Sequence, residues 1–427
     1  MDILIRHGRL IDPASGTDAP GDLLIRDGVI AACGGRIDAQ ADRVIDADGD
    51  LVMPGFIDLH VHFRDPGQTQ KETVETGAAA AAHGGYTCVF AMPNTKPAAD
   101  TPQVIRYVEE KAKAAGNVVV HQVGAVTRSQ AGEAPADWQG MYDAGMIAMS
   151  EDGKSCMNSG IYREAMKFAA AHDVVVMAHC EDINMVCGGV MNLDERSKAM
   201  GMKGISNAVE DVIVARDILL AKETGARLHL CHCSTKDSVR MVREARADGI
   251  AVSAEVCPHH FTLTTDDIPG DDPNYKMNPP LRTKADAEAL RQGLSDGTMQ
   301  VISTDHAPHT AQEKSGSMKD APFGIVGLET AAALTWTVLV EGGYLTPLQM
   351  AEKMSYNPAQ IAKIPGGSLA PGARADVVLL NITDTWTIDP ADFRSKGKNT
   401  PFTGMRVRGR VKMTIAGGEV AYEEAQA

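Results

Sequence analysis

The period of the hydrophobic positions changes along the chain. Apolar and polar side chains alternate in three N-terminal segments, residues 3–10, 23–32 and 43–52. Turn-forming Asp-Gly or Gly-Gly pairs lie within or between these segments, at 27–28, 34–35 and 48–49. Alternation with period two, interrupted by such turns, is typical of β-hairpins. The N-terminal part is therefore predicted to consist of short strands.

From Pro54 onward, short apolar runs alternate with segments of helical period. The apolar runs are residues 56–59, 86–91, 118–123, 146–149, 174–178, 227–231, 251–256 and 299–303. The helical segments are residues 73–83, 103–115, 161–171, 208–224, 237–247 and 285–294. Eight such units favour a closed parallel barrel over an open sheet. Residues 374–388 and 404–422 then return to strand patterning.

These patterns predict an α/β fold with two parts. Residues 54–365 are expected to form a (β/α)8 barrel of the TIM type. Residues 1–53 and 366–427 are expected to form a small β-sandwich-like domain from both chain termini. Two connections, 180–207 and 309–327, are too long to be plain linkers, and we expect them to act as binding loops or lids.

Composition narrows the class of protein. The 427 residues are 44% hydrophobic and 23% charged, which excludes a mainly disordered chain. The net charge of −15 argues against a nucleic-acid binder, and an acidic substrate would need locally placed cations. No apolar run approaches the ~18 residues of a membrane span, and no secretory leader pattern opens the chain. We expect a cytoplasmic protein without membrane or nucleic-acid partners.

The eight cysteines are scattered along the chain, which favours reduced, mostly buried thiols over a disulfide framework. Cys231-His232-Cys233 resembles part of a zinc ribbon. A second Cys-x-x-Cys pair at the required spacing is missing, so we do not expect these two cysteines to be structural ligands.

Chemically versatile residues follow the predicted strands, where a barrel builds its active site. They are His60, His62, Asn94, Asp152, His179, His232, His259, His260, Asp305, His306 and His309. Four imidazoles, at His60, His62, His179 and His232, together with two carboxylates, suit a pair of divalent cations. The spacing of His60 and His62 puts both rings on one side of an extended segment. Metal-assisted hydrolysis of an amide, or its reversal, is the chemistry indicated. His229 is expected to be a packing residue.

Several motifs together resemble the amidohydrolase superfamily, specifically its dihydroorotase branch. They are GFIDLHVHFRDPG at 55–67, MPNT at 92–95, LCHCS at 230–234, CPHH at 257–260, STDHAPH at 303–309 and KNTPFTG at 398–404. Any one of them is weak evidence, but they cover essentially the whole chain. The resemblance implies reversible cyclisation of N-carbamoyl-L-aspartate to L-dihydroorotate, a step of pyrimidine synthesis, by a zinc-dependent cyclic amidohydrolase.

The resemblance also implies roles for individual residues. His60 and His62 would bind one of two Zn²⁺ ions per subunit, and His179 and His232 the other. Asp152 would bridge both, and Asp305 would complete the first site and act as general acid/base. Contacts to the dianionic substrate are implied for His62, Arg64, Asn94, Asn278, His309, Phe323 and Gly324. Arg64 suits a carboxylate, because a guanidinium donates two parallel hydrogen bonds.

The bridging ligand has a rival. Many members of the superfamily bridge their metals with a carboxylated lysine. In Ser150-Glu151-Asp152-Gly153-Lys154, Lys154 lies two positions after Asp152, so in an extended segment both side chains would point to the same side. Asp152 is favoured because it directly precedes the glycine turn and is anionic without modification.

Two other functions compete with the main interpretation. A hydantoinase or allantoinase would typically use the carboxylated lysine and lack the MPNT phrase. A non-catalytic homologue serving as a scaffold for a carbamoyltransferase would lack metal ligands, whereas this chain has the full set. The sequence leaves open whether the chain forms a homodimer or associates with a carbamoyltransferase.

Overall fold

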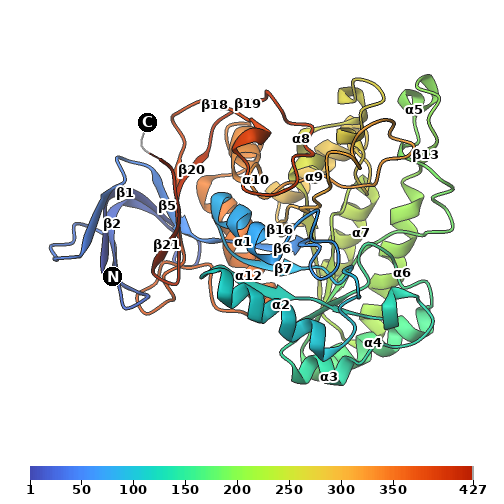
Figure 1. Ribbon diagram of the computed structural model, residues 1–427, viewed down its shortest axis with the longest axis horizontal. Coiled ribbons are helices and arrows are strands. Elements are labelled where there is room, and N and C mark those ends of the chain that lie inside the picture. Colours follow the sequence, from blue (N-terminus) through green and yellow to red (C-terminus); the bar gives the residue numbers. More distant parts are fainter. Residues whose placement is uncertain (426–427) are drawn as a thin grey trace.

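The computed structural model describes residues 1–425, and both ends of the chain contribute to one mixed β-sheet. Within those residues the sheet has eight strands in the order β21-β20-β17-β5-β1-β2-β3, with β4 paired to β1. The strands are β1 (Ile3–Asp12), β2 (Thr17–Arg26), β3 (Val29–Cys33), β4 (Arg43–Asp46), β5 (Leu51–Pro54), β17 (Val377–Asn381), β20 (Arg410–Ala416) and β21 (Glu419–Glu423). Figure 1 shows these blue and red strands together at one end of the molecule.

The N-terminal strands are separated by turns at the Asp-Gly pairs, as the sequence predicted. The predicted strand 23–32 is a hairpin, with β2 and β3 joined by Asp27 and Gly28, whose φ angles are +49° and +77°. Two central residues with positive φ are the requirement of a tight type I′ turn. One face of the sheet buries its own apolar cluster, in which Ile5, Val377 and Ile415 are fully buried. The termini therefore share a core that is separate from the barrel core.

The barrel follows directly from β5, and each of the eight apolar runs overlaps one of its parallel strands. They are β6 (Phe56–Val61), β7 (Tyr86–Ala91), β8 (Val119–Gln122), β10 (Ala148–Ser150), β11 (Val175–Ala178), β14 (Leu228–Leu230), β15 (Val252–Val256) and β16 (Val301–Ile302), with β9 (Gly124–Ala125) continuing β8. Parallel pairing runs from β6 to β8 and from β9 to β16. A bridge between Val61 and His306, and the hydrogen bond from His62 N to His306 O (2.8 Å), join the first strand to the end of the last. The barrel is thereby closed.

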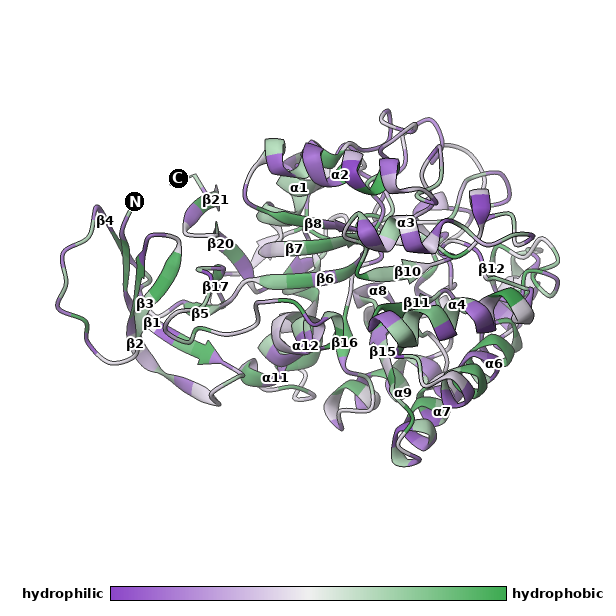
Figure 2. Ribbon diagram, turned by 90° about the horizontal axis from the view of Figure 1, so that it is seen from below, coloured by the Kyte–Doolittle hydropathy of each residue, from purple (hydrophilic) through white to green (hydrophobic). Residues whose placement is uncertain are grey.

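The six predicted helices are present with ends shifted by at most two residues. They are α1 (Val74–His83), α2 (Pro102–Ala115), α4 (Ser159–His172), α6 (Ala208–Thr224), α7 (Lys236–Ala247) and α9 (Lys284–Ser295). Neighbouring strand residues separate into two cores: Val175 and Met177 pack with Leu59, whereas Val176 and Ala178 pack in the cluster shared with the helices. Figure 2 shows β6 and β7 mostly in the hydrophobic colour, and α6 and α7 with both colours.

Several helical segments lie outside the predicted set. Short helices form at α3 (Trp138–Asp143) and α8 (Pro258–Thr262), and a helical region at 331–362 follows the last strand. That region combines α10 (Ala331–Leu334), α11 (Pro347–Ala351) and α12 (Asn357–Ala362) with π-helical turns at Thr335–Val340 and Glu352–Tyr356. Of the helices in residues 1–425, none is both long and apolar enough to cross a membrane.

The two long connections differ in structure. The first, 180–207, contains the small parallel pair β12 (Met191–Asn192) and β13 (Gly204–Ile205), with α5 (Glu195–Ala199) between them. The second, 309–327, consists of turns and bends. Ile183 of the first loop and Phe323 of the second line the same cavity, so both loops border the mouth of the barrel.

Candidate metal centre and active site

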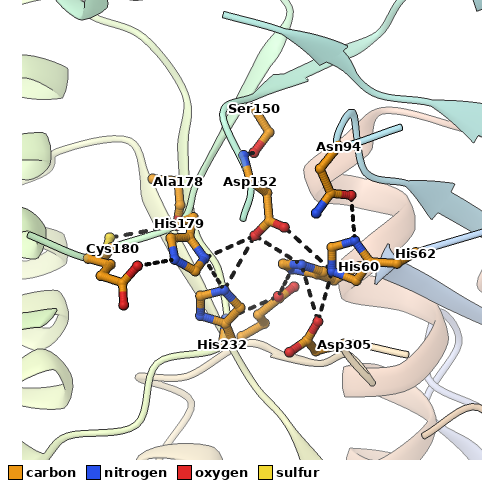
Figure 3. A network of polar contacts seen from close by, with 12 residues as sticks. His60, His62, Asn94, Ser150, Asp152, Ala178, His179, Cys180, His232 and Asp305 are labelled. Atoms are coloured by element: carbon orange, nitrogen blue, oxygen red, sulfur yellow. Dashed lines mark hydrogen bonds and ion pairs between the residues drawn. The ribbon is translucent and has the colours of Figure 1, made fainter. Parts of the chain in front are cut away.

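The predicted site residues converge at the C-terminal ends of the barrel strands. Figure 3 shows Asp152 at the centre of a polar network with His60, His62, His179 and His232. These residues come from β6 or from the first two positions after β6, β10, β11 and β14. All of them except His60 line a cavity of about 400 Å³, a volume suited to a small ligand.

Asp152 contacts all four histidines. Its Oδ1 lies 3.2 Å from His60 Nε2, 3.1 Å from His179 Nδ1 and 3.4 Å from His232 Nε2. Its Oδ2 lies 3.4 Å from His62 Nε2. A zinc ion with ligand bonds of about 2.0–2.1 Å in tetrahedral geometry separates its ligands by roughly 3.3 Å. The spacing of these donor atoms therefore suits metal coordination.

Asp305 stands on the other side of the first two histidines. Its Oδ1 lies 3.0 Å from His62 Nε2 and 3.6 Å from His60 Nε2. Burial raises the pKa of the Asp305 carboxyl, but the contact with His62 and the charges of the neighbouring histidines outweigh burial and hold the pKa at about 2. Burial likewise opposes ionisation of Asp152, and the surrounding histidines nevertheless keep its pKa well below the ordinary value. Both carboxyls are thus available as anionic ligands.

The ring of His60 shows that the donor set fits a cation. His60 Nδ1 lies 2.9 Å from Glu255 Oε1, and an ionised carboxylate only accepts, so Nδ1 carries the proton. In the neutral ring His60 Nε2 then presents a lone pair, and it points at carboxylate oxygens of Asp152 and Asp305. Among the described residues this buried atom has no hydrogen-bond partner. Facing lone pairs in a buried site are stable when a cation lies between them.

Glu255 is a buried neighbour of the site that the sequence reasoning missed. It is fully buried and accepts hydrogen bonds from His60 Nδ1 (2.9 Å), His229 Nε2 (2.9 Å) and the backbone N–H of His232 (3.1 Å). His229 is packed in the interior as expected, and it also bonds Ser253 Oγ (2.8 Å). The sequence did contain a sign of this role, because Glu255 is a carboxylate inside the apolar run 251–256. A buried carboxylate needs hydrogen-bond donors around it.

Three predicted substrate contacts are tied to the histidines or stand beside them. Asn94 Oδ1 accepts a hydrogen bond from His62 Nδ1 (2.8 Å). Asn278 Nδ2 donates to Glu181 Oε1 (2.8 Å), and Glu181 Oε2 lies 3.4 Å from His179 Nε2. Glu181, also unpredicted, therefore links His179 to Asn278. Arg64 is buried, adopts a φ of +59°, and lines the cavity with Nε unpartnered among residues 1–425.

The loop after the eighth strand supplies the remaining cavity wall. His309 Nε2 donates to Phe323 O (2.8 Å), so its Nδ1 is the acceptor that faces Lys71 Nζ at 3.3 Å. The Gly324 N–H donates to Lys276 O (3.0 Å), so Gly324 contributes shape rather than a free donor. A Cβ on Gly324, whose φ is +124°, would lie only 2.7 Å from Ala307 Cβ, so only glycine fits there.

Other candidate residues lie around the cavity rather than in it. Lys154, the rival bridge, is exposed and donates from Nζ to Gln130 O (3.0 Å), and it is not among the described residues that line the cavity. His259 and His260 are buried on α8, where His260 Nε2 donates to Pro279 O (2.9 Å). His306 points away from Asp305, with Nε2 at 3.4 Å from Glu72 Oε2.

The cysteines form no disulfides in the described residues. The eight thiols are free, and most are buried. Cys231 Sγ lies in one group of donor atoms with His60 and Glu255, and Cys257 lies in another with His259 and His260. Burial raises the pKa of the Cys231 thiol, which favours the neutral form.

Comparison with known proteins places the chain in a family. A family model described as "Dihydro-orotase-like" matches residues 49–238. Curated proteins named dihydroorotase include one from Pelotomaculum thermopropionicum, 49% identical with 99% of each chain covered, and one from Bacillus subtilis, 46% identical with 100% of this chain and 99% of the relative covered. A solved structure of an L-hydantoinase (dihydropyrimidinase) from Arthrobacter aurescens superposes with a TM-score of 0.89 at 28% identity, covering 100% of this chain and 97% of the other.

The barrel and the histidine and aspartate cluster at its mouth define a cyclic amidohydrolase. Relatives named dihydroorotase share 45–49% of their residues with the chain, well above the 28% shared with the hydantoinase. The chain belongs to the dihydroorotase family.

Proposed function

We propose that this chain catalyses the reversible cyclisation of N-carbamoyl-L-aspartate to L-dihydroorotate, in cytoplasmic pyrimidine (UMP) biosynthesis. The observation that carries the proposal is the carboxylate of Asp152 within 3.4 Å of four imidazoles, beneath a cavity that also holds Arg64. The family membership supports the same reaction. The hydantoinase alternative has weaker support, because its representatives are more distant in sequence.

The residues present would hold two zinc ions. His60, His62 and Asp305 would bind one, His179 and His232 the other, and Asp152 would bridge them. Imidazole nitrogens and carboxylates are ordinary zinc ligands, and cobalt or manganese suits them as well. When bound, such a pair supplies Lewis-acid activation of water and of the amide carbonyl.

Asp305 is the proposed general acid/base. Its Oδ1 faces His62, which leaves Oδ2 to exchange a proton. In ring opening, Oδ2 accepts a proton from the attacking water and delivers it to the ring nitrogen as the C–N bond breaks. In ring closure the ureido nitrogen loses its proton to Oδ2, and the departing oxygen takes it up. A carboxylate that is ionised at neutral pH is ready for the first of these steps.

Substrate binding is assigned to the cavity wall. Arg64 would clamp the carboxylate that does not react, through two parallel N–H groups. Asn94 and Asn278 offer amide groups already oriented by His62 and Glu181. These contacts, with His309 and the Phe323-Gly324 turn, would hold the ureido group of the substrate over Asp152 and Asp305.

A rate assay combined with metal counting tests this proposal. The purified protein should open L-dihydroorotate and close N-carbamoyl-L-aspartate, with about two metal ions per chain. Asp305→Ala should retain folding but lose about 10²-fold or more of kcat, since a positioned acid/base contributes on this scale. Turnover of hydantoin or allantoin with none of dihydroorotate would show that the substrate is wrong. Full activity in Asp305→Ala would remove the assigned role.

A further inference from the structure

The segment at 398–404, distant from the barrel strands in sequence, packs against the active-site loop. Asn399 within it is only 4% exposed. Its side chain accepts a hydrogen bond from His309 N (3.0 Å) at Oδ1. Its Nδ2 donates to Ala307 O (3.1 Å) and to Gly324 O (3.0 Å). One amide group therefore joins the start of the loop 309–327 to its end.

The backbone of Asn399 adds a further contact at the end of the loop. Its carbonyl accepts from Val326 N (2.9 Å). The segment around it is itself anchored, because Ser395 Oγ donates to Glu72 Oε2 and the Lys396 N–H donates to Glu72 Oε1 (3.2 Å). Glu72 is buried just before α1. The loop is thus fastened to a support that is fixed to the barrel.

The groups that Asn399 touches are those that shape the cavity. Ala307, His309, Phe323 and Gly324 all line it. The ring of His309 donates a hydrogen bond to Phe323 O (2.8 Å), which links the two ends of the loop. A displacement of either end would therefore move both His309 and Phe323. None of the four proposed histidine ligands is among the hydrogen-bond partners of the Asn399 side chain in the described chain.

We infer that Asn399 is a positioning residue for substrate binding, acting through the backbone of His309 and Gly324. The inference rests on the proposed function and assigns a role to a residue outside the barrel strands. An amide is needed because the site presents one N–H and two carbonyl oxygens. Aspartate would place an oxygen against both carbonyls, and leucine would leave all three groups unsatisfied.

Kinetics of the metal-loaded enzyme test the inference. Asn399→Leu should raise KM for dihydroorotate about tenfold, with kcat within roughly threefold of wild type, because ground-state binding is lost while Asp305 is untouched. Metal content should equal that of wild type. Asn399→Asp keeps the acceptor for His309 N and is nearly isosteric with asparagine. It is the second test variant if the leucine variant folds poorly, and the KM of Asn399→Asp should also rise.

Asn381→Leu is the matched control, since Asn381 is a similarly buried asparagine whose Nδ2 donates to Asp50 (2.8 Å) in the terminal sheet. It should lower the melting temperature without changing KM. Thr403→Ala, an exposed position in the same segment, should change neither. Unchanged KM in both Asn399 variants, or an equal rise in Asn381→Leu, would overturn the inference.

Amide hydrogen exchange provides a test that does not depend on the substrate. In Asn399→Leu, a peptide containing the His309 N–H should exchange at least tenfold faster than in wild type, because its acceptor is gone. Unchanged exchange would contradict the positioning role. A wild-type enzyme inactive on dihydroorotate would instead refute the proposed function, so the two failures are distinguishable.

Discussion

At the scale of single residues, the site is organised around buried carboxylates. Asp152 and Asp305 face imidazole nitrogens on the inner side of the site, whereas Glu255 and Glu181 contact the opposite ring nitrogens of His60 and His179. His60 faces the site through Nε2 and His179 through Nδ1, so each ring needs its own partner behind it. The partners behind the rings decide which nitrogen is free to bind a metal.

A pair of variants discriminates between the two candidate bridging ligands. Asp152→Ala should lose most of the bound metal and lower kcat by several orders of magnitude, since it removes the group that contacts four imidazoles. Lys154→Ala should keep full metal content and activity within about twofold, because the Lys154 amine bonds a backbone carbonyl outside the cavity. Metal analysis and intact mass provide the measurements. An extra 44 Da on wild-type protein, with metal retained in Asp152→Ala, would favour a carboxylated lysine instead.

Glu255→Gln tests the support behind His60. The glutamine keeps the volume of the side chain but cannot accept from both His60 and His229 as an anion does. The zinc affinity should fall about 10- to 100-fold, the range usual for loss of a group that orients a ligand. Competition with a chelator measures this affinity. Glu244→Gln, on the exposed face of α7, is the control and should match wild type. Equal affinities would mean that Glu255 only fills space.

At the scale of elements, the fold was predictable where periodicity is strong. The apolar runs identify all eight strand positions, and α6 begins and ends where the pattern predicts. The region 331–362 was missed because it mixes short α-helices with π-helical turns, which have no fixed hydrophobic period. Residues placed at strand ends could be found, since the barrel gathers them. Glu255, Glu181 and Asn399 could not be found this way, because their roles come from contacts between distant segments.

The N-cap of α9 offers a test at the same scale. Thr283 Oγ1 accepts from Asp286 N (3.3 Å), and the Asp286 side chain accepts in return from Thr283 N (3.3 Å). Thr283→Ala should lower the free energy of unfolding by about 1 kcal/mol. The control is Thr101→Ala at the N-cap of α2, where no capping bond from the side chain is present in the described residues. Chemical denaturation measures both. A loss of equal size in Thr101→Ala would show that capping is not the cause.

At the scale of the whole molecule, two cores meet at β5, where Val52 packs in the terminal cluster and Leu51 and Met53 pack in the barrel cluster. We propose that residues 54–365 form the catalytic barrel and that residues 1–53 and 366–427 form the second domain. The two are not independent, because Ser395 and Asn399 of the C-terminal part hold loops at the barrel mouth. The C-terminal part therefore contributes to the site as well as to the sheet. The −15 charge describes the outer surface, whereas the cavity has its own cation in Arg64.

Metal removal should reveal how the site is coupled to the barrel. The proposed ligands come from β6 and from the segments after β10, β11, β14 and β16, so a bound metal pair would connect strands around the whole barrel. Without cations, the buried carboxylates of Asp152 and Asp305 lose the metal charge that would compensate them. The melting temperature should therefore fall by roughly 5 °C on chelation and recover when zinc is restored, since a ligand at ~1,000 times its Kd stabilises by about 4 kcal/mol. Differential scanning fluorimetry measures the shift, and Asp152→Ala should show little of it. An identical melting temperature with and without bound zinc would mean that the strand ends are held in place by the protein alone.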